Sequence, residues 1–137
     1  MYCAANAGRL SQVAEIARST ATTRPHVHKM LHPLVEAQLL TTVRGRNGGL
    51  RLARPADEIT VLDVVRVTEE DFIMAECFDN ELADCPLIDN CALNSALREA
   101  LTAFFSVLAR YTIADLIAAR ADIGVVFRLP GTDRIAG

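Results

Sequence analysis

The sequence predicts a mainly α-helical protein that carries one small β-hairpin. Three observations lead to this fold class. Two short segments with helical apolar periodicity lie in residues 11–37, an arginine-rich pair of strand-like segments follows them, and an amphipathic segment spans residues 91–110. Two adjacent helices followed by a hairpin are typical of a winged helix-turn-helix, and the long amphipathic segment suits dimerisation.

The two helices of the expected helix-turn-helix are marked by capping residues. Ser11 is suited to be the N-cap of a helix that ends near Arg18, and Thr23 can cap a second helix that runs to about Ala37. Residues 1–7 resemble the last turns of a further helix. The pattern alone leaves an ordinary helical hairpin as the alternative.

A hairpin with a basic surface is predicted directly after these helices. Residues 39–43 and 50–55 have the composition of two short strands, and the Asn-Gly-Gly sequence at 47–49 favours a tight turn between them. The tip and flanks carry four arginines and no acidic residue: Arg44, Arg46, Arg51 and Arg54. A solvated basic hairpin without a partner is the alternative interpretation.

The charge of the chain is distributed unevenly. Residues 1–55 carry eight basic side chains and two acidic ones, a net charge of +6, whereas the remainder carries six basic and fifteen acidic side chains, a net charge of −9. This asymmetry indicates an anionic partner for the first part of the chain only. Together with a winged helix-turn-helix, it predicts double-stranded DNA as that partner.

Candidate DNA-contacting residues lie on the second helix and on the hairpin. On the helix they are Thr22, Thr23, Arg24, His26, His28 and Lys29, and on the hairpin Arg44, Arg46, Asn47, Gly48, Gly49 and Arg51. The two glycines are expected to permit close approach of the backbone. His28 and His32 also have the spacing of a metal-binding pair, but an exposed or DNA-facing pair is the preferred interpretation.

Three of the four cysteines fall within fifteen residues, with the spacing C-x7-C-x5-C: Cys77, Cys85 and Cys91. Thiolates at this density can share an iron–sulfur cluster, which is the preferred interpretation. Zinc is a weaker alternative because structural zinc sites favour closer pairs of cysteines, and a thiol redox switch is a third. Cys3 stands apart on an apolar face and is expected to be a core residue.

Three further helices are predicted at 61–67, 91–110 and 113–119, with Thr60, Asn90 and Thr112 as N-caps. The helix at 91–110 has a broad apolar stripe, and a second copy of the chain is the natural partner to bury it. The predicted organisation is a DNA-binding domain (1–55), a linking helix (56–75), a cysteine loop (76–91), a dimerisation helix with a short C-terminal helix (92–120) and a loosely held tail (121–137).

Several classes of protein are excluded by the pattern. The longest apolar run, 103–109, is far shorter than a membrane span of about 20 residues. The N-terminus has no signal-peptide pattern, so we expect a cytoplasmic protein that does not act at a membrane. No nucleophile–base pair is evident, so we expect neither an enzyme nor a small-molecule substrate.

The chain resembles the bacterial iron–sulfur winged-helix regulators, which include cysteine-biosynthesis, iron–sulfur-assembly and nitric-oxide-sensing repressors. The resemblance is carried by residues 15–17, 42–52 and 63–65, by the three-cysteine segment and by the amphipathic helix after it. The sequences at 75–78, 84–87 and 91–98 are most similar to the rhizobial iron-responsive subgroup.

This resemblance implies a homodimer that carries an iron–sulfur cluster, expected to be [4Fe-4S], and binds a palindromic DNA operator. It further implies repression of iron-uptake genes while iron is ample, and weaker DNA binding when the cluster breaks down. The nitric-oxide-sensing subgroup has the same architecture and is the alternative.

The sequence departs from the family pattern in two places. Family members begin roughly a dozen residues upstream of Met1, so we expect the source of the fourth cluster ligand to be missing. In this form, or after aerobic preparation, the cluster is expected to be bound poorly or lost. In addition, Ala21 stands in the helix-turn-helix turn where a glycine is usual.

Overall fold

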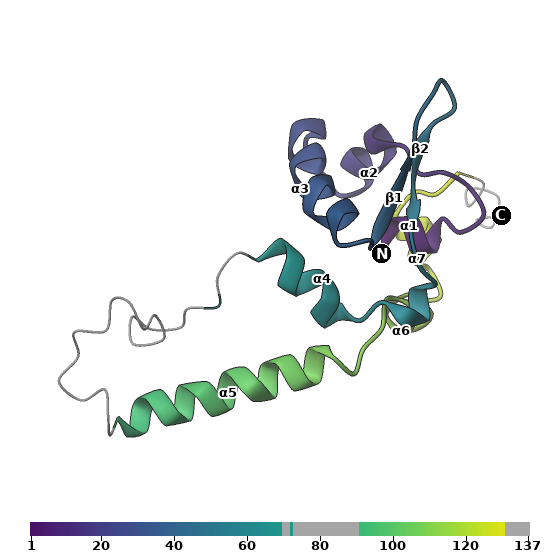
Figure 1. The fold of residues 1–137 in the computed structure, drawn as a ribbon. Coiled ribbons are helices and arrows are strands. Elements are labelled where there is room, and N and C mark those ends of the chain that lie inside the picture. Colours follow the sequence, from purple (N-terminus) through teal and green to yellow (C-terminus); the bar gives the residue numbers. More distant parts are fainter. Residues whose placement is uncertain (70–71, 73–90, 131–137) are drawn as a thin grey trace.

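The computed structural model describes residues 1–69, 72 and 91–130. In chain order its elements are α1 (Tyr2–Ala5), α2 (Val13–Ser19), α3 (Arg24–Glu36), β1 (Leu40–Val43), β2 (Gly49–Leu52), the 3-10 turn η1 (Ala56–Glu58), α4 (Val61–Thr68), α5 (Ala92–Leu108), α6 (Ile113–Ala118) and α7 (Ile123–Val126). Helices α1–α3 gather around the hairpin, whereas α5 extends away from them beside α4 (Figure 1). The predicted fold class is therefore confirmed.

Helix α3 begins and ends as its sequence predicts. The Thr23 side chain accepts a hydrogen bond from the backbone N–H of His26 at 3.4 Å, and Pro25 lies in the first turn, where its missing N–H costs nothing. The helix ends at Glu36 with Ala37 as its C-cap, and Gln38 then adopts a positive φ of 55°. This local chemistry is enough to place the second helix of the helix-turn-helix.

The predicted cap of α2 was wrong by one residue. Gln12 is the N-cap, and the Glu15 carboxylate accepts a hydrogen bond from its backbone N–H at 3.1 Å. Ser11 instead is fully buried and pairs with Leu50 of the hairpin, its N–H lying 2.8 Å from the Leu50 carbonyl. The long-range backbone pairing with Leu50 thus occupies Ser11, the residue that helix-capping propensity favours as the N-cap.

The later helices follow their predicted starts closely. Thr60 and Thr112 are N-caps of α4 and α6, and each forms a reciprocal capping box with the aspartate three residues later. Helix α5 begins one residue later than expected: its N-cap is Cys91, whose Sγ accepts from the Asn94 N–H at 3.4 Å. The expected cap, Asn90, lies outside the described residues.

The hairpin is antiparallel and runs from the Leu40–Leu52 pair to the Val43–Gly49 pair. Its turn is closed by a hydrogen bond from the Gly48 N–H to the Gly45 carbonyl at 2.9 Å, which puts Arg46 and Asn47 at the tip. Glycine is required at position 48, because a Cβ there would lie 2.2 Å from the Val43 carbonyl oxygen. The tip is therefore one to two residues earlier than the Asn-Gly-Gly sequence suggested.

The core unites both halves of the chain. Leu39, Ile59 and Ile113 form its buried centre, with Leu34 of α3 and Val64 of α4 among the partly buried residues packed on it. Two backbone hydrogen bonds of 2.8 Å, Ile113 N–H to Ile59 carbonyl and Val61 N–H to Tyr111 carbonyl, join the starts of α4 and α6. The end of α5 is thereby fixed against the winged helix.

Two residues of the predicted loose tail, Phe127 and Leu129, are packed into the fold. Leu129 is buried, and the Phe127 ring lies 5.6 Å from the ring of Tyr2 in α1. The Ser19 hydroxyl donates to the Phe127 carbonyl at 2.6 Å. For residues 121–130 the expectation of a loose tail was wrong, and residues 131–137 lie outside the described part.

The turn between α2 and α3 uses a left-handed residue. Ala21 has a φ of 51°, and the Thr22 N–H bonds back to the Ala17 carbonyl at 2.9 Å, which is the pattern of a Schellman cap. Non-glycine residues pay roughly 1–2 kcal/mol in this conformation. Ala21 is therefore strained.

We predict that Ala21→Gly stabilises the protein. Relief of the left-handed strain outweighs the extra chain entropy of glycine, so the free energy of unfolding should rise by roughly 0.5–1 kcal/mol. Denaturant unfolding measures the change, with Ala14→Gly inside α2 as a control that should lose about 1 kcal/mol. An Ala21→Gly protein that is less stable than the wild type would contradict the assignment of strain to this turn.

Candidate nucleic-acid interface

An open groove of about 800 Å³ lies between α3, the hairpin and the start of α2. It brings together predicted residues from the helix and from the hairpin: Arg24, His28, Arg44, Gly48 and Gly49. Its walls are formed by one long face of α3 and one face of a two-stranded sheet. A helix beside a projecting basic hairpin is an arrangement that can place one element in a DNA groove and the other on the phosphates.

The other predicted hairpin residues are exposed but do not line this groove. Arg46 and Asn47 are at the tip, and Arg51 projects from the face of β2 opposite to the groove-lining Leu50, because successive strand side chains alternate. On α3, Thr23 and Lys29 are also exposed. All five side chains are accessible to a partner, and their role in DNA binding stays a prediction.

Thr22 and His26 are placed differently from the rest of the predicted set. Both line an apolar cavity of about 460 Å³ on the other side of α3, together with Val27 and Met30. Cys3 lines the same cavity and is half-buried, and burial raises the pKa of its thiol. Helical periodicity alone did not show which face of α3 meets the hairpin, so it could not separate these residues from Arg24 and His28.

The groove is also lined by polar residues that were not among the DNA candidates. Gln12 comes from the N-cap of α2, Thr42 from β1, and His32 and Glu36 from the C-terminal half of α3. The spacing of His28 and His32 had marked them as neighbours, and His32 lies 3.3 Å from Glu36, both side chains being exposed. Gln12 carries no sequence signal, since only the fold brings it beside the hairpin.

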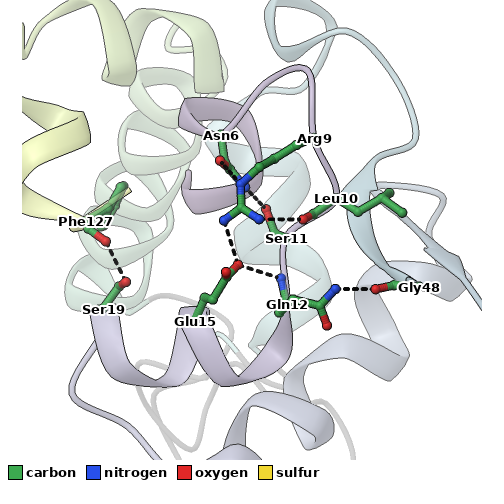
Figure 2. Close-up of polar contacts among 9 residues, drawn as sticks. All are labelled: Asn6, Arg9, Leu10, Ser11, Gln12, Glu15, Ser19, Gly48 and Phe127. Carbon is green, nitrogen blue, oxygen red and sulfur yellow. Dashed lines mark hydrogen bonds and ion pairs between the residues drawn. The ribbon is translucent and has the colours of Figure 1, made fainter. Parts of the chain in front are cut away.

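Arg9 contributes to the basic charge of the N-terminal part but is engaged within the fold (Figure 2). Its guanidinium bonds to Glu15 at 2.9 Å and to Asn6 at 3.1 Å. Burial opposes ionisation of Glu15, but the hydrogen bonds from Gln12 and Arg9 and the arginine charges outweigh it and lower the pKa of the carboxyl. Arg9 thus braces the start of α2.

Of the three clustered cysteines, only Cys91 belongs to the described part of the chain; Cys77 and Cys85 lie outside it. The Cys91 thiol is half-buried at the N-terminus of α5, where it accepts a backbone N–H. Within residues 1–69, 72 and 91–130, no three His, Cys, Asp or Glu side chains come together as a metal-binding group.

Helix α5 has two apolar stripes. One is half-buried toward α4 and consists of Leu97, Leu101, Phe105 and Leu108. Phe105 meets Phe72 edge to face at 4.8 Å between ring centroids, and the Arg66 guanidinium of α4 lies 5.9 Å from its ring centre. The other stripe is exposed, with Leu93 at 67%, Phe104 at 48% and Val107 at 41%, and Tyr111, which follows the end of the helix, is 50% exposed.

The helix-turn-helix, the adjoining basic hairpin and the groove between them define a winged-helix DNA-binding protein. The family model that matches residues 1–119 is Rrf2, described as an iron-dependent transcriptional regulator. The chain belongs to this family, which consists of transcriptional regulators and not of enzymes. In the described part of the chain, no helix is long and apolar enough to cross a membrane.

Similar proteins agree with this assignment. Protein aau3 of Rhizobium meliloti is 57% identical over 129 residues, which cover 94% of this chain and 84% of that protein. The regulator NsrR of Oceanobacillus iheyensis is 42% identical over 108 residues, or 79% of this chain and 74% of the relative. The structure of CymR, the global cysteine regulator of B. subtilis, aligns with a TM-score of 0.65 and 25% identity, covering 87% of each chain.

We predict that Arg46→Ala weakens binding to DNA of any sequence, because a phosphate contact at the hairpin tip carries no base information. The logarithmic salt dependence of affinity should fall by about one unit. Fluorescence anisotropy at several salt concentrations measures both quantities. Arg110→Ala, which removes the same charge at the end of α5, is the control, and an unchanged slope in Arg46→Ala would place Arg46 outside the interface.

Proposed function

We propose that this protein is an iron-responsive transcriptional repressor of the cytoplasm, whose dimer binds a palindromic operator while an iron–sulfur cluster is present. The observation that carries the DNA-binding part is the groove that joins Arg24 and His28 of α3 to Arg44 of the hairpin. The iron-dependent part is supported by the family description and by the three clustered cysteines.

Cys77, Cys85 and Cys91 would hold the cluster, expected to be [4Fe-4S]. The donor set fits, because iron–sulfur clusters are bound by thiolates and these three fall within fifteen residues. Cys91 fits in particular: at the N-terminus of α5 its sulfur accepts an N–H, and the helix dipole favours negative charge there. When bound, such a cluster supplies sensitivity to iron supply, because it is lost when iron is scarce.

A symmetric dimer through α5 would bury the exposed stripe that contains Leu93, Phe104 and Val107. Large side chains this exposed, in line along one helix of about 25 Å, mark an interaction surface. A twofold axis beside α5 would present two winged helices to the two half-sites of a palindrome.

A second candidate is sensing of nitric oxide with the same architecture. It rests on the resemblance of the chain to the nitric-oxide-sensing regulators, which have the same three-cysteine segment and long helix. The two candidates differ in the signal, so exposure of the cluster-loaded protein to iron chelator or to nitric oxide, followed by DNA binding, separates them. A zinc or thiol structural module remains the candidate without a regulatory cluster.

We predict that protein purified without oxygen is brown, has broad visible absorption and loses its colour with an iron chelator. Cys91→Ser should abolish the colour because it removes a thiolate ligand, whereas Cys3→Ser, away from the cluster segment, should retain it. Absorption spectra and iron and sulfide analysis measure this. Gel shifts should show tighter operator binding by the brown form than by the bleached form.

A colourless protein with stoichiometric zinc would contradict the cluster and favour the zinc module. Equal operator affinity of the brown and bleached forms would contradict regulation by the cluster, even if the cluster itself is present.

We predict that Phe104→Glu converts the dimer to a monomer, because it places a charge in the apolar stripe that a second copy would bury. Sedimentation equilibrium measures the assembly state. Thr102→Glu, exposed on a different face of α5, is the matched control and should stay dimeric. A Phe104→Glu protein with undiminished dimerisation would place the interface elsewhere.

A further inference from the structure

We propose that Gln12 is a positioning residue that holds the hairpin tip at the angle its arginines need to reach DNA. The inference rests on the proposed DNA-binding function and deepens it. Gln12 is the N-cap of α2, and its side-chain amide donates a hydrogen bond to the carbonyl of Gly48, thirty-six residues away (Figure 2).

This bond reaches the hairpin beyond the end of its ladder. The strand register closes at the Val43–Gly49 pair, and Gly48 lies past it, next to the tip residues Arg46 and Asn47. The hydrogen bond to Gly48 therefore restrains the part of the hairpin that carries Arg46. Without it, the tip would be held by the short turn bond between Gly48 and Gly45 alone among the contacts described there.

The residue that holds the tip is itself rigidly anchored. Ser11, its neighbour, exchanges two backbone hydrogen bonds with Leu50, at 2.8 and 2.9 Å. The Ser11 hydroxyl is fully buried and accepts from Asn6 at 2.9 Å. The backbone N–H of Gln12 is fixed on the Glu15 carboxylate, which Arg9 neutralises.

The approach of the two segments is as close as the backbone allows. A Cβ at Gly49 would lie 2.9 Å from the Ser11 carbonyl oxygen and 3.0 Å from the Cβ of Leu10. Glycine at position 49 thus serves the docking of the hairpin on the start of α2. The amide of Gln12 extends this docking from β2 to the turn.

Gln12 is exposed and lines the groove, so its side chain is accessible without contributing to the core. A change at this position therefore leaves global stability nearly unaffected, and a loss of DNA affinity can be traced to the hairpin. A direct contact between the accessible Gln12 side chain and a DNA phosphate is the alternative. This alternative predicts that the losses of DNA affinity caused by Gln12→Ala and Arg46→Ala are additive.

The test uses full-length Gln12→Ala and Gln12→Glu, the latter similar in size but without the amide donor. In the free protein, hydrogen exchange at residues 44–48 should accelerate in both variants, while thermal unfolding midpoints stay close to the wild type. With a short duplex of mixed sequence at low salt, Gln12→Ala should bind roughly 2- to 10-fold more weakly, as expected for one lost hydrogen bond.

A double-mutant cycle with Arg46→Ala then separates positioning from contact. If Gln12 acts through the tip, the double variant should bind little worse than Arg46→Ala alone. Fully additive losses, with normal hairpin exchange, would show a direct phosphate contact and overturn the proposal; unchanged exchange in both Gln12 variants would overturn it as well. Failure of the wild type to bind DNA would instead overturn the proposed function, and the exchange result would still decide whether Gln12 holds the hairpin.

Discussion

The burial of Ile59 against Leu39 and Ile113 is the interaction on which the arrangement of the whole chain depends. Ile59 stands just before α4, and Ile113 is the first residue of α6, which follows α5. This small apolar centre therefore holds together the two ends of the segment that contains α4 and α5. The two backbone bonds of 2.8 Å beside it prevent the ends from sliding apart. Leu39 connects the same centre to the end of α3 and the start of the hairpin.

The same geometry sets the path between the proposed cluster segment and the DNA-facing groove. Cys91 is at the start of α5, a full helix length away from the fixed end near Ile113. Between them, Phe105 contacts Arg66 of α4 and the ring of Phe72, which comes after α4 in the sequence. Because α4 also packs on α3, a continuous series of packed helices connects α5 to the helix that lines the groove.

Sequence reasoning succeeded where short-range chemistry decides the structure. The threonine caps at Thr23, Thr60 and Thr112 were predicted because the hydrogen bonds that make them are local. Ser11 has the same propensity, but pairing with Leu50 overrides it. The packing of Phe127 and Leu129 had no periodic signal, since it arises from contacts with elements more than one hundred residues away.

The same contrast between local chemistry and long-range packing applies to the candidate site. Periodicity located α3 and composition located the basic hairpin, so the sequence could nominate Arg24, His28 and Arg44, which line one groove. Packing decides which face of α3 meets the hairpin. As a result, His26 lines the apolar cavity and Gln12 lines the groove.

The packing of Leu129 and Phe127 onto the first helices has a further consequence during synthesis. The N-terminal helices cannot complete these contacts until residue 127 has been synthesised, so their final packing follows the synthesis of every helix between α1 and α7.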